Sequence, residues 1–389
     1  MRARSAAPGR PVADSGLLGI AALTWQAAVM LALGGLLVYL GIARQVEPVL
    51  LVPIGTGVIL ANIPLGGLTE PGGLLAVLRA TGVDTELFPL LIFIGVGAMI
   101  DFGSLLERPY TVFLGAAAQF GIFGTFFLAY LVGDGGLRLF DFSFKDAASI
   151  GIIGSADGPT SIYVATFLGS KYAPAIVVAA YSYMALVPII QPPIMRALTT
   201  ETERRLVMPA RARRVSRRTR VLFPIVTILV VGLIAPKATP LIGTLMFGNL
   251  LRESGVVERL SQAAQNELAN VVTILLGLAV GGMLVAEDFL RPETLMIYVM
   301  GVVAFAVGTA AGLLFGKAMY LASGRRINPL IGAAGISAFP MAARVVQKVG
   351  LEANPHNHLI MHAAGANTAG QIASVVAGGA VLMLVPLFA

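Results

Sequence analysis

Long apolar stretches recur along this 389-residue sequence, and they restrict the fold more than any other feature. A helix needs about 20 apolar residues to cross a bilayer, because each residue adds about 1.5 Å of length. Only 12% of the residues are charged, about half of the roughly 25% that soluble domains carry. We therefore predict an all-α polytopic membrane protein embedded in a lipid bilayer. The clearest predicted spans are 17–43, 87–100, 111–133, 173–198, 221–236, 268–286, 294–322 and 359–388.

Four further apolar segments are short or interrupted by glycine and proline. In lipid, irregular backbone persists only where protein or a cavity surrounds it, since unpaired backbone groups are costly there. We expect these segments to face the interior and to bring the total to about 10–12 membrane segments. They are 48–63, 147–168, 239–251 and 328–347.

A strongly basic run lies near the middle of the chain, between Glu201 and Arg220. A short arginine-rich loop between apolar segments follows the positive-inside rule, so we place 201–220 in the cytoplasm. Because the run has this explanation, a nucleic-acid partner is not predicted. Its eight arginines are Arg204, Arg205, Arg211, Arg213, Arg214, Arg217, Arg218 and Arg220.

The two longest interrupted segments resemble each other. Residues 151–169 read GIIGSADGPTSIYVATFLG, and residues 332–350 read GAAGISAFPMAARVVQKVG. Weaker matches precede them in the same order, with an offset that falls slowly along the chain, as loops of unequal length would produce. Paired interrupted segments at corresponding positions are typical of transporters whose site lies between two repeats. The earlier matches are Ile54-Gly55-Thr56 with Ile242-Gly243-Thr244, Asn62 with Asn249, and Gly97-Ala98-Met99 with Gly281-Gly282-Met283.

These matches divide the chain into two repeated halves with an elevator-like transporter architecture. We favour an inverted relation, which requires an odd number of spans in each half. The predicted parts are an N-terminal tail and extra helix at 1–47, a first half at 48–198, the arginine-rich loop at 199–220, a connecting helix at 221–238 and a second half at 239–389. The tail begins with Arg2, Arg4 and Arg10 and lacks a signal-peptide pattern, so we expect it to be uncleaved.

Asp157 is the acidic residue that we expect deepest in the membrane. Glycine and proline follow it directly, which predicts a helix break with free carbonyl groups. A carboxylate beside such carbonyls and the hydroxyls of Ser155, Thr160 and Ser161 forms an all-oxygen group suited to Na⁺, for which a proton can compete. The alternative is an interfacial aspartate that only caps a helix.

The corresponding segment of the second half contains Asn328, Gly332 and Ser337 but no acid. Arg344 lies seven residues after Ser337, two helical turns on, and could share its face and pair with an anionic group. The alternative for Arg344 is an arginine that reaches to the membrane surface.

Three other polar residues lie in apolar surroundings. Asn367 sits among small residues that helix packing alone would explain, yet its amide is a candidate ligand. Tyr181 and Tyr183 could donate hydrogen bonds or protons, or could be ordinary interface tyrosines.

Several long motifs strongly resemble the beta subunit of the sodium-pumping biotin-dependent decarboxylases, which act with oxaloacetate, methylmalonyl-CoA, glutaconyl-CoA or malonate. The resemblance covers roughly residues 45–389, and we find none of it before residue 45. Ser155 departs from it, because glycine is more usual there. The motifs are 151–160, 181–188 (YSYMALVP), 191–193 (QPP), 101–103 (DFG), 247–256 (FGNLLRESGV), 264–268 (AQNEL) and 328–344.

The resemblance implies a subunit of the bacterial inner membrane that decarboxylates carboxybiotin, exports Na⁺ and consumes a proton. It implies that Asp157, Asn367 and Ser337 bind Na⁺, that Asn328, Gly332 and Arg344 face carboxybiotin, and that Asp157, Tyr181, Tyr183 and Arg344 act in the reaction. Expected partners are a biotin carrier and carboxyltransferase subunit, a small membrane subunit and further copies of this chain. The chain lacks the MKM motif that carries biotin, which fits a cofactor delivered by a partner.

One alternative function remains open from the residues alone. The same repeat architecture could serve a stand-alone Na⁺/H⁺ antiporter or a Na⁺-coupled anion transporter, with no enzyme partner. The sequence contains no nucleotide-binding or hydrolase motif to separate these possibilities.

Overall fold

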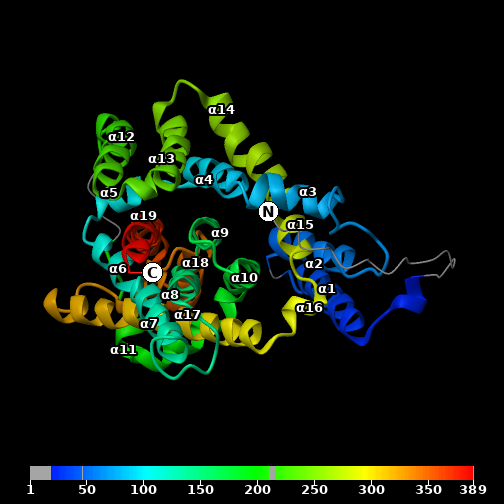
Figure 1. Cartoon of the computed structure of the whole chain (residues 1–389). Coiled ribbons are helices and arrows are strands. Elements are labelled where there is room, and N and C mark those ends of the chain that lie inside the picture. Colours follow the sequence, from blue (N-terminus) through cyan, green and yellow to red (C-terminus); the bar gives the residue numbers. More distant parts are fainter. Residues whose placement is uncertain (1–18, 46, 210–214, 389) are drawn as a thin grey trace.

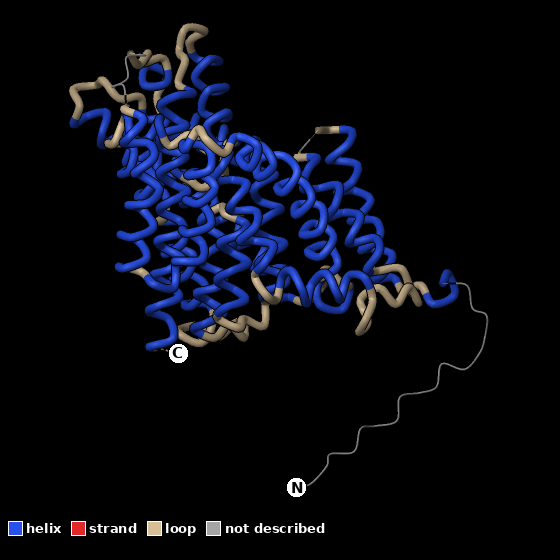
Figure 2. The backbone as a smooth tube through the Cα atoms, turned by 90° about the horizontal axis from the view of Figure 1, so that it is seen from above, coloured by secondary structure: helices blue, strands red, loops and turns tan. Residues whose placement is uncertain are grey.

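The computed structural model describes residues 19–45, 47–209 and 215–388, and all elements within these ranges are helical. The predicted basic tail at Arg2, Arg4 and Arg10 lies outside the described residues, as do Arg211, Arg213 and Arg214 of the arginine-rich loop. Figure 2 shows that most loops gather at the two ends of the helical bundle. The prediction of an all-α protein is therefore confirmed for the described residues.

The elements before the arginine-rich loop begin with two packed helices, α1 and α2. Short 3₁₀ and π segments, labelled η, interrupt the α-helices that follow. The order is η1 (Gly19–Ala22), α1 (Trp25–Ala43), α2 (Pro48–Ala61), α3 (Leu74–Leu78), η2 (Arg79–Val83), α4 (Leu87–Met99), α5 (Gly103–Glu107), α6 (Thr111–Ala118), α7 (Phe120–Val132), α8 (Phe144–Gly151), η3 (Ile152–Ser155), α9 (Gly158–Phe167) and α10 (Ala173–Leu198).

The elements from the loop onward run to the C-terminus. They are α11 (Glu201–Arg204), α12 (Arg217–Ile234), η4 (Pro236–Ala238), α13 (Thr239–Ser254), α14 (Glu258–Ala263), η5 (Ala264–Leu268), α15 (Ala269–Gly282), α16 (Ala286–Phe289), α17 (Pro292–Ala322), η6 (Pro329–Gly335), α18 (Met341–Ala353), α19 (Ile360–Leu384) and η7 (Val385–Leu387).

Helix α12 begins earlier than the connecting helix predicted at 221–238. It starts at Arg217 because the Ser216 hydroxyl accepts a hydrogen bond from the Thr219 amide at 3.2 Å and caps the helix. The last residues of the predicted arginine-rich loop are therefore the first turn of this helix.

Five helical segments in the described residues are long and apolar enough to cross a membrane, or seven if each bent pair of helices counts as one span. This is fewer than the 10–12 membrane segments expected, because the interrupted pieces are too short to count as spans on length. One bent pair is α10, which turns by 65° between Met184 and Leu186. Pro188 follows closely and cannot supply the amide hydrogen that a straight helix needs there.

The helices form two groups. Figure 1 shows α6 to α10 and α17 to α19 gathered in one region, with α1, α2 and α15 in another. We call the first group, together with α5, the core group, and the second, together with α3, α4, α13 and α14, the flanking group. The flanking group is held by close backbone contacts: a side chain at Gly57 would meet Gly281, and one at Gly97 would meet the Leu245 carbonyl.

The order of elements from α2 to α10 resembles the order from α13 to α19. Each stretch contains, in order, a helix, a short helix with a π turn, an apolar helix, a very short helix, a long helical segment, a 3₁₀ break and two further helices. The first stretch has one additional helix, α8, before its break. Helix α2 packs on α15, and α13 packs on α4, so corresponding helices exchange partners between the two stretches.

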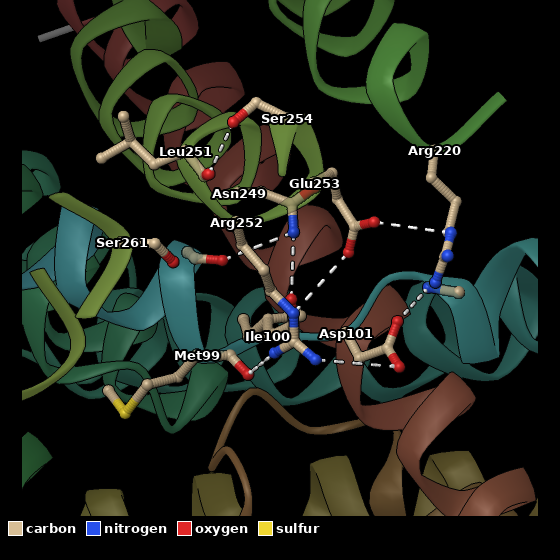
Figure 3. Close-up of polar contacts among 12 residues, drawn as sticks. Met99, Ile100, Asp101, Arg220, Asn249, Leu251, Arg252, Glu253, Ser254 and Ser261 are labelled. Carbon is tan, nitrogen blue, oxygen red and sulfur yellow. Dashed lines mark hydrogen bonds and ion pairs between the residues drawn. The ribbon is translucent and has the colours of Figure 1, made fainter. Parts of the chain in front are cut away.

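Two asparagines make the same contact at corresponding places. The Asn62 amide donates to the Leu284 carbonyl at 2.7 Å, just after α15 ends. The Asn249 amide donates to the Ile100 carbonyl at 3.0 Å, just after α4 ends (Figure 3). Each therefore satisfies an unpaired carbonyl at the end of a helix from the other stretch.

Candidate functional site

Two helix breaks meet inside the core group. The first lies between η3 and α9, where Ala156 adopts the left-handed conformation with φ 55°. The second lies between η6 and α18 and contains Ser337, whose amide donates to the Ser155 carbonyl at 3.1 Å. The interrupted segments of 147–168 and 328–347 are thus in direct contact, as expected from their proline and glycine content.

Asp157 begins helix α9 and is only 1% exposed. Its Oδ1 accepts a hydrogen bond from the Thr160 amide at 3.2 Å, while Pro159 fits the first turn because it needs no hydrogen-bond acceptor there. Asp157 therefore caps a helix, as the alternative interpretation held. The side chain is buried within the protein, and its depth in the membrane stays a prediction.

The other carboxylate oxygen of Asp157 contacts three side chains. Oδ2 lies 2.8 Å from the Thr160 hydroxyl, 2.8 Å from the Ser374 hydroxyl and 3.2 Å from the Gln371 Nε2. Among the described residues, every hydrogen-bond donor to this carboxylate is neutral. A buried carboxylate without a basic partner is stable only if it is protonated or accompanied by a cation.

A cavity of about 100 Å³ lies beside this carboxylate. One wall comes from the flanking group and the other from the core group, so the cavity lies where the two groups meet. A water molecule occupies about 30 Å³ of liquid, so the space suits a small hydrated cation. The flanking wall consists of Leu50, Ile92, Phe93, Val96 and Thr273, and the core wall of Asp157, Pro159, Tyr181, Met184, Ser337, Phe339 and Gln371.

Three buried oxygens near the cavity have no hydrogen-bond partner within the described part of the chain: Tyr181 Oη, Gln371 Oε1 and Asn367 Oδ1. Each such group costs about 1–3 kcal/mol unless something binds it. Asn367, Gln371 and Ser374 follow one another at intervals of four and three residues on α19, so they lie on one face. The chemistry of the set, a carboxylate with amide and hydroxyl oxygens, fits a hard cation.

Ser337 and Tyr181, two of the predicted site residues, both line this cavity, and their roles stay predictions. The Ser337 hydroxyl donates to the Gly370 carbonyl at 2.8 Å, which ties the second break to α19. The Tyr181 ring lies against Gly158, where any larger side chain would collide with it. Asn367 does not line the cavity, but its amide donates to the Ile336 carbonyl at 2.7 Å and supports the same break.

Tyr183 is separated from Tyr181. Its hydroxyl donates to the Tyr298 carbonyl, and its ring packs on Gly301 of α17. Both tyrosines are 4% exposed, so they are not interface tyrosines.

Arg344 is exposed on α18. Our prediction that Arg344 shares a helix face with Ser337 was wrong, because Ser337 precedes α18 and is not helical. Arg344 instead approaches Glu47 at the start of α2: burial raises the pKa of the Glu47 carboxyl, and the Arg344 guanidinium partly offsets that rise. Arg344 of the core group thus influences the Glu47 carboxyl of the flanking group, although no ion pair joins them among the described residues.

Asn328 and Gly332 do not line the cavity. The Asn328 amide donates to the Leu206 carbonyl at 2.8 Å and anchors the first part of the arginine-rich loop. Gly332 touches the backbone of Gly312 on α17, where a Cβ would lie 2.0 Å from a carbonyl oxygen. Their contacts position the second break, and the carboxybiotin role expected for them stays a prediction.

The sequence analysis missed Gln371, which contacts Asp157 directly. Its position four residues after Asn367 was the signal that could have identified it, because residues at this spacing share a helix face.

Comparison with known proteins shows the family. The family described as "Na+-transporting oxaloacetate decarboxylase beta subunit" matches residues 26–385. This match begins before residue 45, so helix α1 belongs to the family, contrary to our expectation.

Three relatives carry different substrate names. The chain is 52% identical to the methylmalonyl-CoA decarboxylase subunit beta of Veillonella parvula, over 95% of both chains. It is 50% identical to the glutaconyl-CoA decarboxylase subunit beta of Acidaminococcus fermentans, over 94% of this chain and 95% of that one. It is 48% identical to the oxaloacetate decarboxylase beta chain 2 of Salmonella typhi, over 95% of this chain and 97% of that one. The chain belongs to the family of beta subunits of the Na⁺-transporting decarboxylases.

Proposed function

We propose that the cavity at Asp157 is the site where this subunit binds Na⁺ and exchanges it for a proton. The main support is the buried Asp157 carboxylate, whose hydrogen-bond donors among the described residues are all neutral. Near it lie side-chain oxygens of Gln371, Asn367 and Tyr181 that have no hydrogen-bond partner among the described residues. Na⁺ and H⁺ each neutralise the carboxylate, and only Na⁺ also binds the other oxygens. Release of one ion therefore favours binding of the other.

The energy comes from decarboxylation of carboxybiotin that a partner subunit delivers. When carboxybiotin releases CO₂, the electron pair of the broken bond stays on the biotin ring, whose nitrogen then takes up a proton. Export of one Na⁺ against 100 mV costs about 2.3 kcal/mol, so transport must be coupled to such a reaction. Arg344 is our candidate for attracting the carboxylate group of carboxybiotin, because an exposed guanidinium can donate two parallel hydrogen bonds to a carboxylate.

The two halves are inverted repeats, and the core group moves against the flanking group to expose the site to each side in turn. The exchanged packing of α2 with α15 and of α13 with α4 supports this proposal, as do the matching contacts of Asn62 and Asn249. The cavity at the boundary of the two groups is the place where such movement would open and close a site.

The working complex includes a biotin carrier and carboxyltransferase subunit, a small membrane subunit and further copies of this chain. The acyl substrate is selected outside this chain, which is consistent with similar identity to relatives named for three different substrates. The chain lies in the bacterial inner membrane with the arginine-rich loop at 201–220 in the cytoplasm.

The test is to reconstitute the complete complex in liposomes and to measure CO₂ release from carboxylated carrier at increasing Na⁺. We expect release that requires Na⁺, with Na⁺ transport in step. Na⁺/H⁺ exchange at full rate without any carrier would contradict the proposal and favour the stand-alone antiporter.

A further inference from the structure

A second cavity of about 460 Å³ lies away from the Asp157 site and shares no lining residue with it. Three segments meet around it: Glu107–Tyr110 at the end of α5, Leu206–Pro209 within the arginine-rich loop, and Arg325–Ile327 after α17. His362 near the start of α19 completes the wall.

Positive charge dominates this second cavity. Arg108, Arg325 and Arg326 line it, and Glu107 is its one acidic lining residue. The Arg108 side chain is 7% exposed, and its Nη1 donates to Glu107 Oε2 at 3.1 Å. Arg325 and Arg326 are exposed and form no ion pair with any other described residue. The cavity thus has more cationic donors than its own acid can satisfy.

A neutral hydrogen-bonding pair lies beside Arg108. The Tyr110 hydroxyl is 3.3 Å from His362 Nδ1, and both side chains line the cavity. Burial raises the pKa of the Tyr110 hydroxyl, and Arg108 opposes that rise. Tyr110 therefore stays neutral at neutral pH, and it and His362 form an uncharged polar part of the cavity wall.

The surroundings distinguish between a dissolved anion and a lipid. Val112 and Phe113 follow Tyr110 on α6 and are exposed, and Leu321 is exposed near the end of α17, four residues before Arg325. Large apolar side chains exposed on transmembrane helices face acyl chains. The basic cavity therefore lies where a polar rim meets an apolar surface, which is where a phospholipid places its phosphate.

We propose that this cavity binds the phosphate of an anionic phospholipid from the cytoplasmic leaflet, with Arg108, Arg325 and Arg326 around the headgroup. The side of the membrane rests on the proposed topology, in which the neighbouring arginine-rich loop is cytoplasmic. Basic pockets between transmembrane helices on the cytoplasmic side suit such headgroups, and arginine matches phosphate geometry.

The experiment is native mass spectrometry of the purified full-length chain titrated with phosphatidylglycerol, with phosphatidylcholine and inorganic phosphate as separate arms. We expect phosphatidylglycerol to bind preferentially. The double variant R325A/R326A should weaken that binding about 30-fold, since each arginine near an anionic lipid contributes about fivefold. The control R44A/R259A removes the same charge from two other exposed arginines that form no ion pair with any described residue, and it should bind as the original chain does.

Three results would overturn the proposal. They are equal binding of both phospholipids, unchanged phosphatidylglycerol binding in R325A/R326A, and complete displacement of phosphatidylglycerol by inorganic phosphate. A fourth result, in which R325A/R326A loses the binding of an acidic partner protein but keeps its lipid binding, would also show that the lipid assignment is wrong. Asp157→Asn should retain lipid binding, so failure of the lipid site and failure of the Na⁺ site are distinguishable.

Discussion

At the residue scale, the central feature is a carboxylate whose neighbours cannot neutralise it. Asp157 has hydroxyl, amide and backbone donors, and the nearby Gln371 directs one amide group to the carboxylate while its oxygen lacks a described partner. An amide used in this way can hold the carboxylate in place and ligate a cation at once. Gln371 therefore gives a sharper test of ion binding than residues that only support the breaks.

We predict that Gln371→Leu raises the Na⁺ concentration for half-maximal turnover by about tenfold, because the loss of one amide ligand costs about 1–3 kcal/mol. The measurement is CO₂ release by the reconstituted complex over a range of Na⁺. Gln119→Leu is the matched control, since Gln119 is also buried with an unpartnered Oε1 among the described residues but does not line the cavity. Equal shifts in both variants would contradict a specific role for Gln371.

Tyr181 and Tyr183 have different surroundings, so removing the hydroxyl should have a different effect at each position. Tyr181→Phe removes a hydroxyl that has no described partner and lines the cavity, so Na⁺ dependence should change while thermal stability is kept. Tyr183→Phe removes the hydrogen bond to Tyr298 and should cost about 1 kcal/mol of stability without changing the Na⁺ requirement. Thermal unfolding and Na⁺-dependent turnover, measured on both variants, separate the two effects; a reversed pattern would refute the assignment.

At the element scale, helix ends of one stretch, α2 to α10 or α13 to α19, are completed by side chains from the other stretch. Asn62 completes the end of α15, and Asn249 completes the end of α4. Arg252 reinforces the second contact by donating to the Met99 carbonyl at 2.6 Å, and it approaches Asp101 at 3.9 Å (Figure 3). Since lipid offers no hydrogen bonds, these exchanged contacts tie the flanking helices into one unit.

We predict that Asn62→Ala and Asn249→Ala each destabilise the chain by about 1–3 kcal/mol, because each leaves a carbonyl buried and unpaired. Thermal unfolding in detergent measures the effect. Asn266→Ala is the control, since its amide only contacts the exposed Gln262 one turn earlier. A large loss in one asparagine variant and none in the other would argue against equivalent roles in the two halves.

The sequence predicted features that depend on the local backbone conformation, and it missed contacts between segments that are far apart in the chain. The breaks at Asp157 and Ser337 were predicted, because glycine and proline determine backbone conformation locally. The shared face of Ser337 and Arg344 was wrong, because the second break extends through Pro340 and α18 begins only at Met341. The two tyrosines were grouped by sequence, yet residues two apart on a helix point in different directions. Gln371 was missed because its contact with Asp157 joins segments 214 residues apart.

At the scale of the whole molecule, the cavity lies at the boundary between the core group and the flanking group. Ile162, Val177, Val178 and Tyr181 of the core group pack into the same apolar cluster as Ile54, Val58 and Leu276 of the flanking group. Within the part of the chain that the structure describes, no ion pair joins the two groups, and such an apolar boundary allows sliding at little electrostatic cost. This is the mechanical basis of the proposed movement.

The absence of cysteine allows a direct test of that movement. Val96→Cys with Met184→Cys places one thiol on each wall of the cavity, and a short bis-maleimide should join them and stop turnover. The control pair is Gly41→Cys with Leu51→Cys within the flanking group, where an ideal Cβ at Gly41 lies 3.5 Å from the Leu51 Cβ. Full turnover in the cross-linked Val96–Met184 protein would show that the two groups need not move.

The most direct test of the account is equilibrium binding of ²²Na⁺ to the purified full-length chain at two pH values, for the original sequence and Asp157→Asn. We predict saturable Na⁺ binding that weakens as pH falls, because protons compete for the carboxylate. In Asp157→Asn we predict that binding falls by at least tenfold and no longer depends on pH. Undiminished, pH-dependent Na⁺ binding in Asp157→Asn would contradict the central claim.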